Sequence, residues 1–289
     1  QANYFRPGLG DDTIDGGAGN DAVDYRNIVG TVGVNLEEGW ATKGGSGDHE
    51  YEDRLTSIES AVGSQYDDLL IGSSGNNTFR GLGGDDTIDG GGGLDVAVYE
   101  GARSGFTVQR TDGDTAVVAD TSGAQGQDGL TSVERLAFAD VYVALDIEPL
   151  GFIDSNDPNK GEGGIAGKAY RLYQAAFART PDLEGVGYWI AQMDAGARLF
   201  DVATGFLGSA EFQAAYGVNP SNETYVRALY QNVLGREPDQ AGYDYWNSVL
   251  NPGLTTRQQM LIDFAESAEN KALVIGAIGN GFEYQAWLG

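Results

Sequence analysis

A nine-residue phrase repeats through the N-terminal half of this 289-residue chain and determines where the backbone can turn. In register with G-G-x-G-x-D-x-U-x, where U is a large apolar residue, four units fill 63–98: GSQYDDLLI, GSSGNNTFR, GLGGDDTID and GGGGLDVAV. Two further units, PGLGDDTID and GGAGNDAVD, fill 7–24, and GAQGQDGLT fits once more at 123–131. Glycines permit tight turns, and the last three residues of a unit suffice for a short strand. The sequence therefore predicts a stack of turn-and-strand coils.

Two units make one coil of 18 residues, and the apolar U positions of successive coils would point inward. These positions are Ile14, Val23, Leu70, Phe79, Ile88 and Ala97. Such a core is thin, so burial alone is not expected to hold the coils together.

The charge of the chain indicates what else could hold the coils. The net charge is −26 with only 17 Lys and Arg, which argues against nucleic acid or an anionic membrane surface as a partner. Carboxylates at this density repel one another unless cations neutralise them. The chain has no cysteine and a single histidine, His49, which leaves oxygen ligands and favours calcium. No apolar run approaches the roughly 20 residues of a membrane span, so no membrane insertion is expected.

The nonapeptide units resemble the RTX repeats of bacterial proteins exported by type I secretion, which form a parallel β-roll with calcium between turns. The resemblance implies that one turn supplies its second and fourth carbonyls and its sixth side chain, and that the turn 18 residues later supplies its first and third carbonyls and its own carboxylate. One implied site joins Ser64, Tyr66 and Asp68 to Gly81, Gly83 and Asp86. A second joins Ser73, Gly75 and Asn77 to Gly90, Gly92 and Asp95. The neutral Asn77 implies weaker binding at the second site.

The earlier units imply further ligands that face a degenerate coil. They are Gly8, Gly10 and Asp12 in the first unit and Gly17, Gly19 and Asp21 in the second. DRLTSIES at 53–60 parallels DGLTSVER at 128–135, which adds Asp53, Glu59 and Asp128 as candidates. The alternative, a flexible acidic linker, is disfavoured by the strict spacing of the apolar positions.

The C-terminal half carries a second repeat, with a period of 57 or 58 residues. YQAAFARTPDLEGVGYW at 173–189 aligns with YQNVLGREPDQAGYDYW at 230–246, and FLGSAEF at 206–212 aligns with FAESAEN at 264–270. The shared R-x-P-D-x-x-G-x-x-Y-W predicts a helix stop at the proline, an aspartate N-cap, a glycine for close packing and an apolar Tyr-Trp pair. We expect a duplicated unit of three helices.

This half resembles a helical module of unknown role that often follows RTX repeats, and is more distantly similar to phycobilisome linker domains. The predicted organisation is therefore multi-domain: an all-β parallel β-roll over 1–150, a linker over 151–164 and an all-α duplicated helical domain over 165–289.

The expected function is structural and adhesive rather than enzymatic, in a secreted or cell-surface bacterial protein. Several calcium ions would fold the roll, while the helical module contacts other surface proteins, copies of itself or extracellular polysaccharide, as in a matrix or S-layer. The alternative is a non-catalytic accessory or export region of a secreted protease or polysaccharide-modifying enzyme whose catalytic domain precedes Gln1. A third possibility is a glycan platform at Tyr188, Trp189, Tyr245 and Trp246, although helical spacing favours a core role for them.

Overall fold

The computed structural model describes residues 1–44, 50–111, 113–147 and 164–287. The chain divides into two compact units, Gln1–Gly161 and Glu162–Gly289. The expected linker at 151–164 lies outside the described residues except for its last position, and so does His49.

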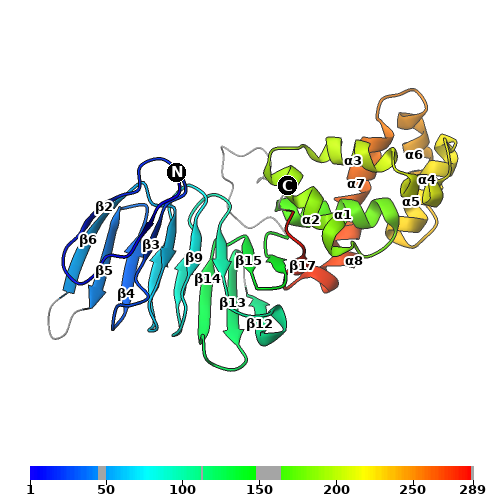
Figure 1. The fold of residues 1–289 in the computed structure, drawn as a ribbon. Coiled ribbons are helices and arrows are strands. Elements are labelled where there is room, and N and C mark those ends of the chain that lie inside the picture. Colours follow the sequence, from blue (N-terminus) through cyan, green and yellow to red (C-terminus); the bar gives the residue numbers. More distant parts are fainter. Residues whose placement is uncertain (45–49, 112, 148–163, 288–289) are drawn as a thin grey trace. The chain divides into compact units, whose positions relative to one another are not determined.

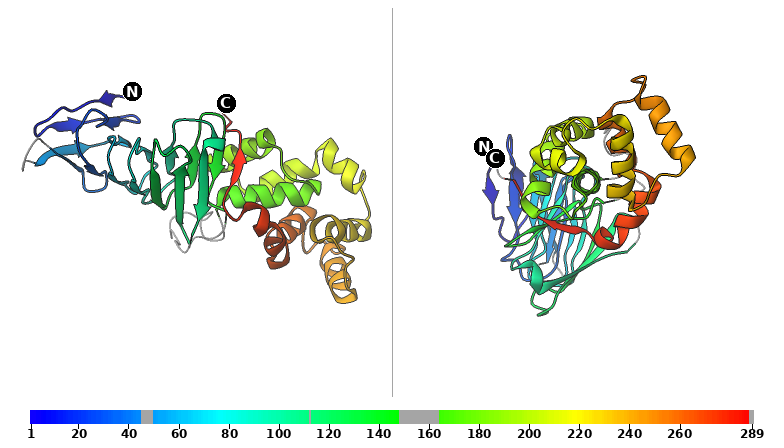
Figure 2. Two further views of the ribbon diagram at one scale, coloured as in Figure 1. Left: turned by 90° about the horizontal axis from the view of Figure 1, so that it is seen from below. Right: turned by 90° about the vertical axis from the view of Figure 1, so that its right-hand side faces the viewer.

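Short strands stack as successive rungs in the first unit, drawn from blue to green in Figures 1 and 2. One sheet has neighbouring strands in the order β1-β3-β7-β9-β11-β15-β16. Their bounds are Tyr4–Phe5, Ala22–Asp24, Ser60–Val62, Thr78–Arg80, Val96–Val98, Arg135–Ala137 and Tyr142–Ala144. Adjacent strands from β1 to β15 are parallel, as coils that return in the same direction require.

The second sheet has the order β12-β13-β14-β10-β8-β4-β5-β6-β2. In chain order, β2, β4, β5 and β6 span Thr13–Asp15, Val32–Asn35, Trp40–Gly44 and Glu50–Thr56. The later strands β8, β10, β12, β13 and β14 span Leu69–Ile71, Thr87–Asp89, Phe106–Arg110, Thr115–Asp120 and Gln127–Thr131, and a 3-10 turn covers Arg103–Gly105. The parallel pairs are β2 with β6, β4 with β8, β8 with β10, and β10 with β14. The roll is thus parallel, with two antiparallel inserts, β4-β5-β6 and β12-β13-β14.

The apolar U positions form the core of the roll, as predicted. Leu70, Phe79, Ile88 and Ala97 are at most 1% exposed, and the earlier Ile14 and Val23 are buried as well. Each strand of the four units at 63–98 contributes one central buried residue, and these side chains form part of the hydrophobic core of the roll.

The described residues of the second unit contain eight helices, confirming the predicted all-α class (Figure 1). The first four, α1 to α4, span Ile165–Phe177, Leu183–Asp194, Leu199–Leu207 and Ala210–Tyr216. The next four, α5 to α8, span Asn222–Leu234, Gln240–Leu250, Arg257–Ala265 and Ala268–Ile278, and β17 follows at Phe282–Tyr284. No described helix is long and apolar enough to cross a membrane.

Each copy has four helices, so the prediction of three was wrong. In both copies the S-A-E segment begins an additional helix. Ser209 and Ser267 are N-caps whose hydroxyl oxygens accept from the backbone N–H of Phe212 and Asn270, each at 3.1 Å.

Candidate metal centres of the roll

The turns 63–68 and 81–86 lie against each other because β8 and β10 pair in parallel. The Asp68 N–H donates to Asp86 Oδ1 at 2.9 Å, across the 18-residue offset. A Cβ atom on Gly63 would lie 2.3 Å from Asp68 Oδ2 and 2.9 Å from the carbonyl oxygen of Gly81. A carboxylate oxygen and a carbonyl oxygen from successive coils therefore meet beside a glycine that leaves them room.

The rest of the first predicted set lies at the same interface. The Gly83 N–H donates to the carbonyl oxygen of Ser64 at 3.5 Å. A Cβ on Gly84 would lie 2.8 Å from the carbonyl oxygen of Tyr66. The structure thus brings the predicted residues of both turns together, and the assignment of individual calcium ligands among them stays a prediction.

The turns 72–77 and 90–95 repeat this arrangement. The Asn77 N–H donates to Asp95 Oδ1 at 2.7 Å, and the Gly92 N–H donates to the Ser73 carbonyl at 2.9 Å. A Cβ on Gly72 would lie 2.1 Å from the Gly90 carbonyl oxygen and 2.7 Å from Asn77 Oδ1.

The orientation of Asn77 shows what the neutral side chain contributes. Its Nδ2 donates in the opposite direction, to the Glu59 carbonyl at 3.1 Å, so the amide oxygen faces the turn 90–95. Asn77 therefore keeps an oxygen at the place of the carboxylate but brings no charge.

The isolated unit at 123–131 forms a third interface, with the turn 81–86. Strand β14 pairs in parallel with β10, and the Asp86 N–H donates to Asp128 Oδ1 at 3.1 Å. A Cβ on Gly126 would lie 2.0 Å from the Gly84 carbonyl oxygen. Asp128 was a candidate on sequence grounds, whereas its pairing with Asp86 comes from the fold, because 42 residues separate them.

Three buried carboxylates follow one another along this edge of the roll. Burial raises the pKa of Asp68 and of Asp128 to about 6. Burial, followed by repulsion from Asp128, raises the pKa of Asp86 to about 8. Each value reflects an unfavourable environment for a charged carboxylate, so the metal-free column is destabilised by its own charge.

The chemistry of these interfaces suits calcium. Oδ2 of Asp86 and Oδ2 of Asp21 are buried and have no hydrogen-bond donor among the described residues. Calcium takes carboxylate and carbonyl oxygens in flexible numbers, and its charge would offset the buried repulsion. Among the described residues, no three His, Cys, Asp or Glu side chains cluster as a metal site, which agrees with sites built largely from backbone carbonyls.

The second nonapeptide unit, GGAGNDAVD at 16–24, carries Asp21 and faces the segment that carries Glu59. The Asp21 N–H donates to Glu59 Oε2 at 2.8 Å, and a Cβ on Gly16 would lie 2.1 Å from the Ser57 carbonyl oxygen. Of the other two residues predicted here, Gly19 would carry its Cβ 2.5 Å from the Gln1 carbonyl, and Gly17 has open space.

The surroundings of the first nonapeptide unit, PGLGDDTID at 7–15, differ from the predicted calcium site. Asp12 meets Asp53, since its N–H donates to Asp53 Oδ1 at 2.9 Å, but a buried cation of the chain itself lies between the two carboxylates. Lys43 Nζ is 3.1 Å from Asp12 and 2.7 Å from Asp53. Gly8 and Gly10 have no described atom within 4 Å of where a Cβ would lie, so no described coil covers them.

Lys43 was not among the residues predicted from the sequence. It lies in WATKG, where alternation on β5 places it on the same face as the buried Ala41. A larger duplication was also only partly recognised: GDDTID occurs at both 10–15 and 84–89, ahead of the paired DRLTSIES and DGLTSVER segments. Ser57 and Ser132 in those segments share a left-handed backbone, with φ of 53° and 51°.

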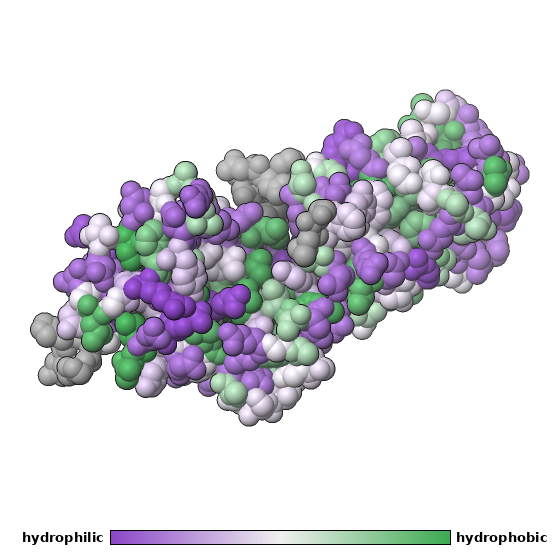
Figure 3. Space-filling view, in the orientation of Figure 1, coloured by the Kyte–Doolittle hydropathy of each residue, from purple (hydrophilic) through white to green (hydrophobic). Residues whose placement is uncertain are grey.

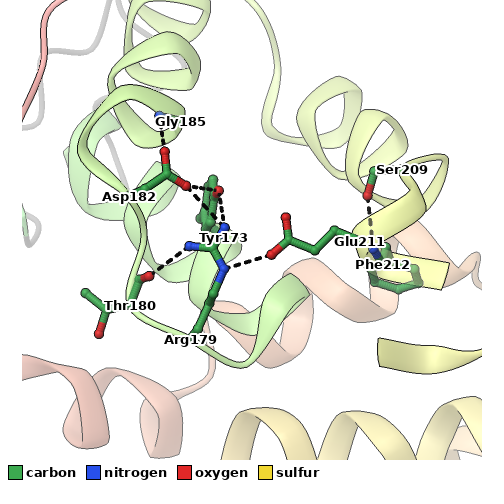
Figure 4. Close-up of polar contacts among 8 residues, drawn as sticks. All are labelled: Tyr173, Arg179, Thr180, Asp182, Gly185, Ser209, Glu211 and Phe212. Atoms are coloured by element: carbon green, nitrogen blue, oxygen red, sulfur yellow. Dashed lines mark hydrogen bonds and ion pairs between the residues drawn. The ribbon is translucent and has the colours of Figure 1, made fainter. Parts of the chain in front are cut away.

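The R-x-P-D motif of the helical unit forms a compact polar network (Figure 4). Arg179 contacts Glu211 at 2.7 Å, Asp182 at 3.2 Å and the Tyr173 hydroxyl at 2.9 Å. Asp182 accepts from the Gly185 N–H at 2.7 Å and is the N-cap of α2, as predicted. The network therefore joins the two aligned motifs of the first copy, R-x-P-D and S-A-E.

The second copy repeats the network with Arg236. Its guanidinium contacts Glu269 at 2.7 Å, and Asp239 is the N-cap of α6, accepting from the Gly242 N–H at 2.8 Å. Each of these partners is a side chain or backbone group of the helical unit itself, so the motif is accounted for by packing and capping.

Within the Tyr-Trp pairs, both tryptophans are half-buried and pack against buried phenylalanines. Trp189 packs edge-on against Phe206, and Trp246 packs against Phe264, with ring centroids 5.1 and 5.4 Å apart. Tyr245, by contrast, is 59% exposed. The expected core role therefore describes the tryptophans better than the tyrosine of the second copy.

Comparisons with known proteins agree with both halves. A family described as RTX calcium-binding nonapeptide repeat (4 copies) matches residues 8–26 and 62–97. A family described as domain of unknown function (DUF4214) matches 169–214 and 203–274. The first match covers both predicted 18-residue interfaces but not the unit at 123–131.

Comparisons with individual proteins are less informative than the two family matches. No curated protein matches the chain. One solved structure with a local match is the extracellular lipase LipA from Serratia marcescens, at 22% identity and a TM-score of 0.19. The match covers 32% of this chain and 18% of the lipase.

Proposed function

Because this chain carries RTX calcium-binding nonapeptide repeats followed by a DUF4214 domain, we propose that it is a calcium-stabilised structural and adhesive region of an extracellular or surface protein exported by type I secretion. RTX repeats bind Ca²⁺ as a structural ion and are typical of such proteins. In this proposal the chain is not an enzyme. Its roll is a scaffold, and its helical unit contacts other surface proteins, further copies or polysaccharide.

One observation carries the calcium part of the proposal. At successive interfaces, carboxylate or amide oxygens converge with carbonyl oxygens of the next coil beside a glycine. The buried oxygens Asp86 Oδ2 and Asp21 Oδ2 have no donor within the described part of the chain. At about 1 mM calcium, a site with a dissociation constant of about 0.1 to 1 mM contributes roughly 0.4 to 1.4 kcal/mol. Several such sites in coils that depend on one another would act cooperatively.

The calcium part is tested by circular dichroism and titration calorimetry on the full chain. In millimolar calcium the strand signal is expected to be complete, and in excess chelator it should fall while the helical signal remains. Magnesium at the same concentration is the control, because its demand for near-octahedral geometry suits these carbonyl-rich turns poorly. An unchanged strand signal together with no heat of calcium binding would refute the proposal.

The adhesive part is supported by apolar side chains that the helical unit leaves exposed. Val218, Tyr245, Leu254 and Leu273 are each more than half exposed, and Figure 3 shows apolar patches among hydrophilic ones on this unit. Tyr245 combines a ring face with a hydroxyl, which suits stacking on a sugar. Binding to a polysaccharide array that is lost in Tyr245→Ala but kept in Val218→Ala, with equal melting temperatures, would support it; equal binding by both variants would count against Tyr245.

A further inference from the structure

The roll contains two structurally equivalent copies of one carboxylate pair. In the first, Asp12 precedes β2 and Asp53 lies on β6, and these strands pair in parallel with Thr13 opposite Arg54. In the second, Asp86 precedes β10 and Asp128 lies on β14, with Thr87 opposite Gly129. The N–H of the first aspartate donates to Oδ1 of the second in both copies, at 2.9 and 3.1 Å.

The strand next to each pair is equivalent as well. Strand β5 is antiparallel to β6 with Ala41 opposite Asp53, and β13 is antiparallel to β14 with Val118 opposite Asp128. Two residues further along each strand lie Lys43 and Asp120. The same place in the fold therefore holds a basic residue in one copy and an acidic residue in the other.

Lys43 is built into the first pair. Its side chain and that of Asp53 are both 0% exposed, and its Nζ lies within 3.1 Å of both carboxylates. The Tyr25 hydroxyl donates to Asp53 Oδ2 at 2.9 Å, which completes the surroundings of the buried carboxylate. A buried ammonium is tolerated only where opposite charge surrounds it, so the lysine and the two aspartates form one unit.

The described surroundings of the second pair contain no such cation. Asp86 and Asp128 are contacted by backbone N–H groups, the Tyr99 hydroxyl lies close to Asp128, and Asp86 Oδ2 has no donor. Asp120 is held by hydrogen bonds from Ser122 and Gln125 within its own turn and supplies no positive charge.

We propose that Lys43 is a resident cation that takes the place of calcium between Asp12 and Asp53, while the equivalent pair Asp86 and Asp128 takes a calcium ion. This rests on the proposed calcium-dependent fold of the roll. The ammonium group is covalently attached, so its local concentration does not depend on the medium. The first copy keeps this interface closed without calcium. Asp12 and Asp53 bind no calcium ion as long as Lys43 is present.

The test is Lys43→Met in the full chain, which keeps the length and apolar stem of the side chain and removes its charge. In chelator, the unfolding midpoint of the variant is expected to fall below that of the unchanged protein. In millimolar calcium the midpoint should recover, and calorimetry should count one more bound calcium ion per chain. The control Lys271→Met removes a lysine of the helical unit, whose partner is Glu266, and should leave the calcium count unchanged.

Terbium luminescence locates the added site. The Tyr25 ring is adjacent to Asp53, so a terbium ion between Asp12 and Asp53 would be sensitised by it. Tyr25→Phe should lower terbium luminescence in the Lys43→Met background and leave it unchanged where Lys43 is present.

The outcomes separate the two hypotheses. If the unchanged protein binds no calcium, the proposed function fails. If it binds calcium but Lys43→Met gains no ion, or stays unfolded in millimolar calcium, the function stands and the resident-cation inference is overturned.

Discussion

Acidification should affect the stability of the roll in opposite directions with and without calcium, because protons and calcium compete for the same buried carboxylates. In the metal-free folded state the pKa of Asp86 is raised from 3.8 to about 8. Between these values the folded chain holds a proton that the unfolded chain releases, so acidification favours the folded state. With calcium bound, the carboxylate must be ionised to act as a ligand, so acidification opposes folding.

The expected size follows from the pKa values. One proton held only by the folded state changes the free energy of unfolding by about 1.4 kcal/mol per pH unit. From pH 8 to pH 6, Asp86 alone should stabilise the metal-free roll by about 2 kcal/mol, because the group is already half protonated at pH 8. Below pH 6, Asp68 and Asp128, each with a pKa of about 6, should add to the slope.

The assay is urea unfolding followed by circular dichroism from pH 8 to pH 5, once in chelator and once in millimolar calcium. Asp86→Asn should flatten the chelator slope between pH 8 and pH 6, whereas Glu100→Gln, which removes an exposed charge of the same unit, should not. The reasoning is refuted if the metal-free roll loses stability on acidification over this range, or if both conditions give slopes of the same sign.

Two substitutions test the glycines that the structure places under constraint. Gly81→Ala would put a Cβ 1.7 Å from Asp86 Oδ2 and should abolish one calcium site by calorimetry, while Gly105→Ala, in open space, should leave the calcium count unchanged. In the helical unit, Gly242→Ala would put a Cβ 2.2 Å from the Tyr230 hydroxyl and should destabilise that unit by about 1 to 3 kcal/mol in thermal unfolding. Gly276→Ala, in open space on α8, is the matched control and should be neutral or stabilising by up to about 1 kcal/mol; equal losses in both variants would contradict the packing argument.

The predictable parts of the fold are those where the type of a single residue determines the local backbone or the direction of its side chain. A spacing of nine sets where turns and inward positions fall, so the amino-acid sequence alone places Leu70 and Phe79 in the core, where both are buried. Asp182 and Asp239 could likewise be identified as caps, because an N-cap depends on residues three apart.

The parts that could not be predicted depend on contacts between distant segments. Lys43 meets Asp12 across 31 residues and Asp86 meets Asp128 across 42, through strand pairings that no local pattern encodes. The helix that begins at each S-A-E segment was missed for a different reason: the alignment of FLGSAEF with FAESAEN shows a repeat but not where a helix ends, although serine is itself a favoured N-cap.

The two antiparallel inserts show that a degenerate segment need not end a roll. Strands β4 and β12 hold equivalent places, since Val34 lies opposite Ala41 and Val108 lies opposite Val118. Strand β4 nevertheless continues the sheet by pairing with β8, whereas β12 is the terminal strand of the same sheet. Arg110, the last residue of β12, donates to the Gly113 carbonyl at 2.9 Å, so this end of the strand is held within its own insert.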